Sequence, residues 1–108
     1  MDKIKKTVRY NSLLHIYGGL LSKTQYAFAD AYFSYDLSLS EIADNREVSR
    51  AAVEDAIKKG LKKLETLESE LHLLEKRENV LKLTKSLKET TTDNKVIKLV
   101  DEIERIIE

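Results

Sequence analysis

The residues best suited to chemistry in this chain are hydroxyl and basic side chains near its middle. Ser49 and Arg50 stand at the start of an expected helix. Four lysines follow on that helix at one-turn spacing: Lys58, Lys59, Lys62 and Lys63. A helix start with a hydroxyl can hold a phosphate, and lysines on one side of a helix can follow a phosphate backbone. The alternative is that the lysines form an ordinary solvated face.

Groups for catalysis are sparse. The two histidines, His15 and His72, have no Cys, Asp or Glu at metal-ligand spacing, and the chain has no cysteine. The serines stand at expected helix starts, where capping explains them. We therefore expect no catalytic residue, no metal and no cofactor, and an enzyme is the least favoured class of function.

The stretch LSLSEIADNREVSRAAVEDAI, residues 37–57, must position the basic residues. It predicts two short helices joined by a tight turn, the first capped by Ser40 or Ser38 and the second by Ser49. Ala43 supplies a small residue where the helices cross, and Val53 and Ile57 anchor the second helix. This layout is a helix-turn-helix, whose second helix normally lies in the DNA major groove. The candidate DNA-binding residues are Arg46, Ser49, Arg50, Ala51, Glu54, Lys58, Lys59, Lys62 and Lys63.

Helices are expected on both sides of this motif. Apolar spacing predicts helices over about 5–20 and 23–35, with Ser22 as the cap of the second and the Gly18–Gly19 pair as a frayed end or a close packing point. From Ser49 to Thr90 no residue stops a helix. That predicts one long helix of about 60 Å, bent or changing partner around residues 77–79. A last helix over 94–108, capped by Thr92 or Asp93, should fold back antiparallel.

The long helix carries apolar residues at heptad spacing, which is typical of a seam between helices. The candidate self-association residues are Leu64, Leu67, Leu71, Leu74 and Leu81. A second copy of the chain would cover them, and so would another protein. We therefore expect a helix-turn-helix domain over 1–66, and a helical hairpin for self-association over 67–108, continuous with the first domain through the long helix.

Composition limits the partners. The chain has 108 residues, 35% charged, no proline and a formal net charge of zero. Helix-favouring residues predict an all-α protein, and the balanced charge argues against binding nucleic acid through bulk positive charge. The amino terminus lacks the apolar region of a signal peptide, and no apolar run is long enough for membrane insertion. We expect a cytoplasmic protein.

Specific residues resemble a known family. The matching positions are 38–44, 48–50, 52–53, 55 and 57–58 in the motif, and 17–18, 20–23, 25 and 36–37 ahead of it. Together they resemble the YlxM family of helix-turn-helix proteins, over about residues 8–71. The family motif is similar to region four of bacterial sigma factors, without a wing. Its genes lie beside that of the signal-recognition-particle GTPase. The resemblance therefore implies a regulatory role in that pathway, with double-stranded DNA or a signal-recognition-particle component as partner.

Three positions depart from that family. Ala51, Glu54 and Ala56 stand where its members usually carry Gln, Tyr and Asn. Gln and Asn read adenine through paired donor and acceptor groups, whereas alanine can only touch a thymine methyl group. Direct base reading is thereby weakened. Two hypotheses remain: a dimeric DNA-binding regulator, and a protein-interaction module that docks through exposed apolar helical stripes.

Overall fold

The computed structural model describes residues 3–108, and all regular structure in that range is helical. The elements are α1 (Lys3–Tyr17), the 3-10 helix η1 (Gly18–Leu20), α2 (Lys23–Phe33), α3 (Leu39–Arg46), α4 (Arg50–Leu71), α5 (Leu73–Thr90) and α6 (Asn94–Ile107). The predicted all-α fold is confirmed. The chain divides into two compact units, one ending at Leu71 and the other comprising His72–Glu108. Among the described helices, none combines the length and apolar character that crossing a membrane requires.

Two helices begin at capping boxes that the local sequence dictates. The Ser22 hydroxyl accepts a hydrogen bond from the Gln25 N–H, and the Gln25 side chain accepts one from the Ser22 N–H. Ser38 and Glu41 make the same reciprocal pair, so Ser38 and not Ser40 caps α3. Hydrogen bonds from the Ser38 backbone N–H and hydroxyl lower the pKa of Glu41. Both caps satisfy N–H groups that a helix start otherwise leaves without a partner.

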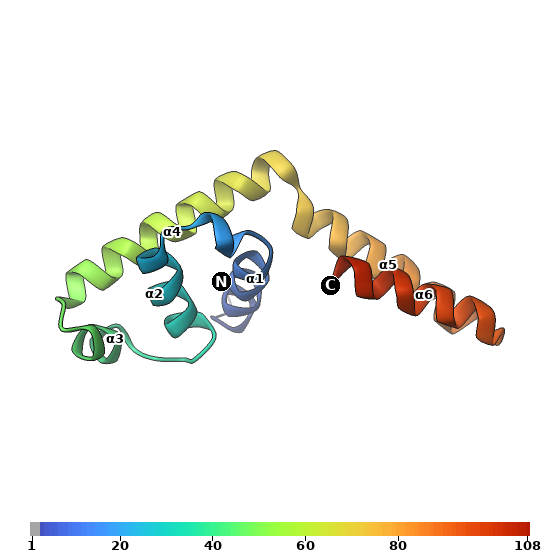
Figure 1. Ribbon diagram of the computed structural model, residues 1–108, viewed down its shortest axis with the longest axis horizontal. Coiled ribbons are helices and arrows are strands. Elements are labelled where there is room, and N and C mark those ends of the chain that lie inside the picture. The colour runs from blue at the N-terminus through green and yellow to red at the C-terminus, as the bar shows by residue number, and fades with distance from the viewer. Residues whose placement is uncertain (1–2) are drawn as a thin grey trace. The chain divides into compact units, whose positions relative to one another are not determined.

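The first unit is built around α4. Helices α1, α2 and α3 each pack against it, as Figure 1 shows. Its buried apolar residues come from all four helices and from the segment between α1 and α2: Leu13, Leu14, Tyr17, Leu21, Phe28, Ala29, Phe33, Ile42, Ala43, Val53, Ile57 and Leu64. Gly18 is a close packing point, because a Cβ there would stand 2.7 Å from the Tyr26 ring.

Polar contacts join α1 to α4. Arg9 donates from Nε and Nη2 to the two carboxylate oxygens of Glu65, at 2.9 and 3.1 Å, and this pairing raises the pKa of Arg9. Deeper in the unit, the Tyr17 hydroxyl donates to Glu68 Oε1 at 2.7 Å, and both residues are buried. These contacts fix the side of α4 that faces away from solvent.

The predicted uninterrupted helix from Ser49 to Thr90 is wrong. Helix α4 ends at Leu71 and α5 begins at Leu73, because His72 has φ 54, in the left-handed region. A left-handed residue cannot continue the helical hydrogen bonds, which restart where Lys76 N–H donates to the His72 carbonyl. The helix does not break around residues 77–79, where a bend or a change of partner was expected, since α5 runs through them.

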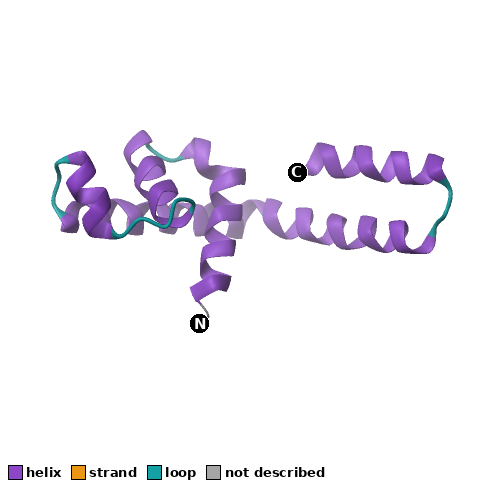
Figure 2. Cartoon of the chain, turned by 90° about the horizontal axis from the view of Figure 1, so that it is seen from below, coloured by secondary structure: helices purple, strands orange, loops and turns teal. Residues whose placement is uncertain are grey.

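The second unit is a hairpin of α5 and α6, which lie side by side and antiparallel (Figure 2), as predicted. Asp93 caps α6 by accepting a hydrogen bond from the Lys95 N–H at 2.9 Å. Lys88 of α5 donates to Asp101 and Glu104 of α6, at 2.7 and 2.6 Å. Glu104 also accepts from the Thr84 hydroxyl, and the bonds from Lys88 and Thr84 lower its pKa.

Candidate nucleic-acid interface

The helix-turn-helix is formed by α3 and the start of α4. Ile42 and Ala43 of α3 are 2% and 4% exposed, and Val53 and Ile57 of α4 are 0% and 6% exposed. The small side chain of Ala43 and the apolar anchors of α4 therefore act as the sequence predicts. Helix α3 packs directly on α4. This packing holds the first turns of α4 at the edge of the unit.

The turn between the helices has an unusual residue at its centre. Glu47 has φ 54 and ψ 43, a left-handed conformation in which glycine is favoured. The Val48 N–H donates to the Ala43 carbonyl at 3.1 Å, which closes the end of α3. Glutamate therefore makes a reversal that glycine would make with less backbone strain.

An exposed tip, residues 44–52, surrounds the start of α4. Every residue in it is exposed, including Val48 at 41%. Ser49 caps α4, because its hydroxyl accepts a hydrogen bond from the Ala52 N–H at 3.0 Å. Arg50 is the first residue of α4 and is exposed. The tip thus presents a helix start, a hydroxyl and a guanidinium to an approaching phosphate.

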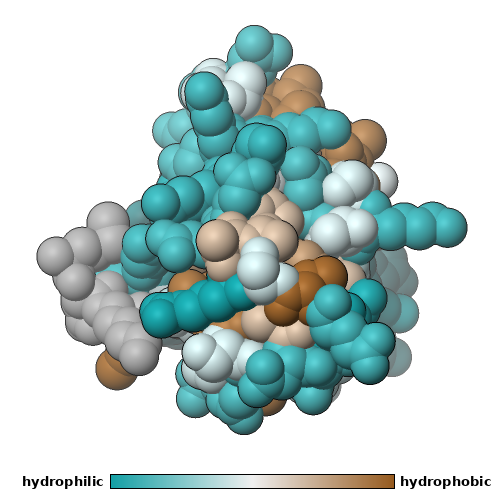
Figure 3. Space-filling view, turned by 90° about the vertical axis from the view of Figure 1, so that its left-hand side faces the viewer, coloured by the Kyte–Doolittle hydropathy of each residue, from teal (hydrophilic) through white to brown (hydrophobic). Residues whose placement is uncertain are grey.

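The tip is not strongly basic. It carries two acidic and two basic side chains. Figure 3 views the molecule from the side where α3 and the start of α4 lie in Figure 1, and it shows a small apolar centre within a hydrophilic surface. The exposed apolar residues of the tip are Val48, Ala51 and Ala52. Apolar methyl groups can meet a thymine methyl group, but they cannot read other base edges by hydrogen bonding.

Several predicted basic residues already have partners within the chain. Lys58 lies 3.2 Å from Glu54, one turn earlier on α4. Lys59 lies 3.0 Å from Asp55 in the same arrangement. Such exposed pairs are weak, so a phosphate can displace them, but each pair cancels a positive charge at long range. Glu54 is half-buried, and its carboxylate faces Lys58.

Of the other basic candidates, two have partners within the chain and two make no ion pair with a described residue. Lys63 donates to the Leu20 carbonyl at the end of η1, so it is held against its own unit. The Arg46 guanidinium lies 5.7 Å from the centre of the Phe28 ring, in a cation–π contact. Arg50 and Lys62 are exposed, and neither makes an ion pair with a residue in the described range. Of the predicted basic candidates, these two are the best placed for phosphates.

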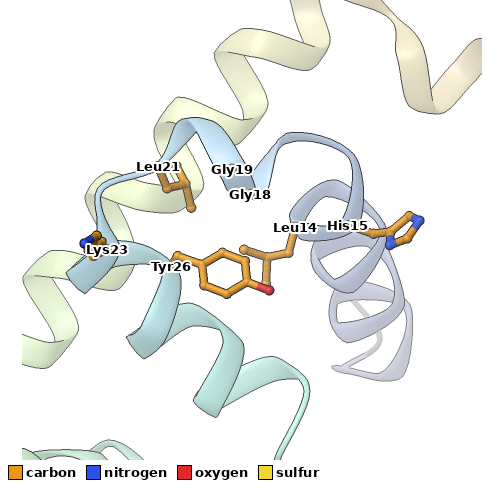
Figure 4. A pocket seen from close by; sticks show the side chains of 7 residues that line it. All are labelled: Leu14, His15, Gly18, Gly19, Leu21, Lys23 and Tyr26. Atoms are coloured by element: carbon orange, nitrogen blue, oxygen red, sulfur yellow. The ribbon is translucent and has the colours of Figure 1, made fainter.

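The cavities of the first unit gather few chemical groups. One is a dent lined by Leu14, His15, Gly18, Gly19, Leu21, Lys23 and Tyr26. In Figure 4, Tyr26 lies beneath the Gly18 backbone, while His15 and Lys23 stand at opposite sides and do not converge. A second cavity has apolar walls from Phe33, Leu39, Ile57 and Leu61 and a polar part from Lys6, Thr7, Tyr32, Glu54 and Lys58. Within residues 3–108 there is no cluster of His, Asp and Glu side chains suited to a metal ion.

The predicted self-association residues are placed mostly inside the units. Leu64 is 0% exposed in the core of the first unit, and Leu74 is 3% exposed in the second. Leu67 and Leu81 are half-buried, so only Leu71, at 45%, is an exposed residue. The break at His72 also interrupts their common seam. Leu64 and Leu74 could contact a second copy only after losing their contacts in the monomer.

Several exposed apolar side chains of the hairpin lie outside the set of predicted self-association residues: Leu83, Leu87, Leu99, Ile103 and Ile106. A signal for them was present in the sequence, since Leu83 and Leu87 fall on a face shifted from the heptad seam. The last helix also has an apolar stripe too broad for one neighbouring helix to cover. The self-association residues were chosen by heptad spacing alone, and this choice left out both the shifted face and the broad stripe.

Comparison with known proteins agrees with this architecture. Residues 4–103 match the UPF0122 family, described as "Putative helix-turn-helix protein, YlxM / p13 like". The chain is 39% identical to UPF0122 protein YofM of Lactococcus lactis, over 98% of this chain and 96% of that protein. It is 38% identical to UPF0122 protein FN1394 of Fusobacterium nucleatum, over 89% of this chain and 93% of the relative. The chain therefore belongs to the UPF0122 family of YlxM/p13-like helix-turn-helix proteins.

Proposed function

We propose that this protein is a regulatory, non-enzymatic helix-turn-helix protein that contacts double-stranded DNA through the start of α4. The observation that carries the proposal is the exposed tip, where Ser49 caps α4 and Arg50 extends beside it. Nothing else in the described first unit brings a helix start, a hydroxyl and a guanidinium together at an open surface. The tip is therefore the best candidate for a phosphate contact.

The contact we propose positions the protein on the backbone and carries little sequence information. Ala51 and Ala56 cannot form the paired hydrogen bonds that distinguish bases. Arg50 and Lys62 offer about two phosphate contacts per copy, which gives a salt slope of about −2. When one copy binds alone, its affinity should therefore fall roughly tenfold between about 50 and 200 mM salt.

Fluorescence anisotropy with a labelled duplex tests this directly. Arg50→Ala should weaken binding and reduce the salt slope by about one. Lys85→Ala is a matched control, because it also removes one exposed positive charge. Lys85 belongs to the second unit and is remote in sequence from the tip. If Arg50→Ala and Lys85→Ala weaken binding equally, the tip is not the contact surface. Absence of binding at low salt would end the proposal.

We further propose that the protein acts in the signal recognition particle pathway, and hence in the cytoplasm. Support comes from its membership in a family whose genes lie beside that of the pathway's GTPase. The test is binding of the purified chain to the purified GTPase and to the particle's RNA, each separately. If neither binds, this assignment fails, while the DNA proposal is unaffected.

The second candidate function is a protein-interaction module, including self-association. The specific observation in its favour is the group of exposed apolar residues on the α5–α6 hairpin, which no described part of that unit covers. Sedimentation of the wild-type chain tests self-association. A monomer at every accessible concentration would contradict it.

A further inference from the structure

Beyond Leu73 at its first residue, the hairpin of the second unit exposes five large apolar side chains. Leu83 and Leu87 of α5 are 67% and 45% exposed. Leu99, Ile103 and Ile106 of α6 are 60%, 41% and 83% exposed. Below we call these five residues the hairpin face. Exposed leucines scattered singly need no explanation, but a contiguous apolar group indicates an interaction surface.

Helical geometry places the five residues on one side of the hairpin. Leu83 and Leu87 are four residues apart, and Leu99, Ile103 and Ile106 are spaced by four and three, so each set forms one stripe. Residues two apart are about 200° apart around a helix, so Asp101 is opposite Leu99 and Ile103. Each stripe is displaced from the α5–α6 contact by a rotation in the same sense about its own helix axis. Because the helices are antiparallel, such rotations bring both stripes to the same side of the hairpin.

The ion pairs mark the opposite side. Lys88 contacts Asp101 at 2.7 Å and Glu104 at 2.6 Å, and these groups lie away from the two apolar stripes. The hairpin thus has one ionic side and one apolar side. This division is what a hairpin needs when one of its sides faces solvent and the other packs on further helices.

The hairpin has too little core of its own. Among its described residues only Leu74, Thr84 and Val100 are buried. Two antiparallel helices normally gain their core from at least one more pair of helices, as in a four-helix bundle. The hairpin face exposes on the order of 500 Å² per copy, so pairing two faces buries about 1,000 Å², near the lower limit for a specific interface.

We infer that the hairpin face packs against the same face of a second copy, so that two hairpins form a four-helix bundle. A second copy supplies helices of matching length and a matching apolar stripe, as a two-fold interface requires. Residues 72–108 contain eight Lys or Arg and eight Asp or Glu, so the two hairpins carry no net charge to repel each other. This inference rests on the proposed self-association and is independent of the DNA contact.

The oligomeric state of the full chain tests the inference. Sedimentation equilibrium up to about 100 μM would detect a micromolar dimer as nearly complete assembly. The variant Leu99→Glu/Ile103→Glu should weaken the dimer about 100-fold or more, since it would bury charges without partners. Ser86→Glu/Asn94→Glu adds the same two negative charges at exposed residues outside the hairpin face and should leave the dimer intact.

A cross-linking measurement covers the case in which the double glutamate variant loses helix content. The chain has no cysteine, so one introduced thiol gives an unambiguous signal. Leu99→Cys should form dimers with a short bismaleimide reagent, and Lys98→Cys should do so much less. A monomeric wild type overturns both the inference and the self-association. A dimer that survives Leu99→Glu/Ile103→Glu, or equal cross-linking at the two positions, overturns the hairpin face while self-association stands.

Discussion

Replacing Glu47 by glycine should stabilise the first unit. Glu47 holds φ 54 at the centre of the turn. A residue with a Cβ costs about 1–2 kcal/mol in that region, whereas glycine adds about 0.5–1 kcal/mol of backbone entropy loss on folding. The balance favours Glu47→Gly by about 0.5–1 kcal/mol. For a unit of this size the melting temperature should rise by about 2–8 °C.

Two companion variants separate backbone strain from charge. Glu47→Ala keeps the strain but removes a negative charge from the carboxyl end of α3, a change of a few tenths of a kcal/mol. Glu47→Asn removes the same charge, and asparagine tolerates the left-handed region better than most residues. Thermal unfolding followed by circular dichroism should rank glycine first and asparagine above alanine. Equal midpoints for Glu47→Gly and Glu47→Ala would refute the strain argument.

In DNA binding, the three variants should not follow their order of stability. Glu47 is exposed and two residues from Ser49. Removing one charge about 8 Å from a phosphate in water changes its energy by about 0.5 kcal/mol, or roughly twofold in affinity. Affinity should therefore rise equally in all three variants, whatever their stability. An affinity that follows the melting temperature would show that the turn's conformation, and not its charge, governs the contact.

Other predictions concern the helix packing and the hairpin. Gly60→Ala should stabilise the first unit by about 0.5–1 kcal/mol in urea unfolding, because Gly60 is within α4 and the new methyl group would stand 3.5 Å from the nearest side-chain atom. Gly18→Ala should destabilise it by about 1 kcal/mol, since its methyl group would stand 2.7 Å from the Tyr26 ring, and the reverse order would contradict the packing described above. The hairpin should lose stability as pH falls below about 4.5, because the folded pKa of Glu104 is lowered and its contribution is present only above that range. Lys88 has a raised pKa, so its contribution persists up to about pH 10.5 and is lost above. Glu104→Gln should flatten the acid side of a pH series of thermal melts, and an unchanged series would show that other carboxylates control it.

The parts of the fold that the sequence predicted are those set by neighbouring residues. Ser22 with Gln25 and Ser38 with Glu41 satisfy each other's backbone groups within one turn, so their positions define helix starts without tertiary information. The choice of Ser38 over Ser40 follows from the same rule, because Glu41 is the third residue after Ser38. The crossing residue Ala43 was predictable from the motif, because the two helices of a helix-turn-helix pack closely at that position.

The helix break and the seam depend on contacts that a local pattern does not contain. The segment Leu71–His72–Leu73 has neither glycine nor proline, yet His72 adopts φ 54. Heptad spacing likewise records that Leu64 is apolar, but not whether its neighbour belongs to its own unit or to a second copy. In the structure Leu64 faces the core of its own unit. For Leu64 the heptad spacing therefore predicted burial, but the residues that bury it belong to its own unit.

The spacing of acidic residues ahead of Lys58, Lys59, Lys62 and Lys63 predicts which of these lysines form ion pairs. Glu54 and Asp55 each precede a lysine by four residues, the favourable order for an ion pair on a helix. The sequence spacing alone therefore predicts ion pairs for two of the four lysines, Lys58 and Lys59. The contact of Lys63 with the Leu20 carbonyl was not foreseeable, because it joins residues far apart in the chain.

The modest charge of the tip connects DNA binding with self-association. One copy offers about two cations to phosphates, Arg50 and Lys62, which gives weak binding at physiological salt. A dimer through the hairpin face would carry two tips, and the second would bind at a high effective concentration once the first has bound. The salt slope of wild-type binding should then approach −4, about twice that of the Leu99→Glu/Ile103→Glu variant. Equal slopes for the dimer and the monomeric variant would mean that each tip binds alone, and that self-association serves a purpose other than DNA affinity.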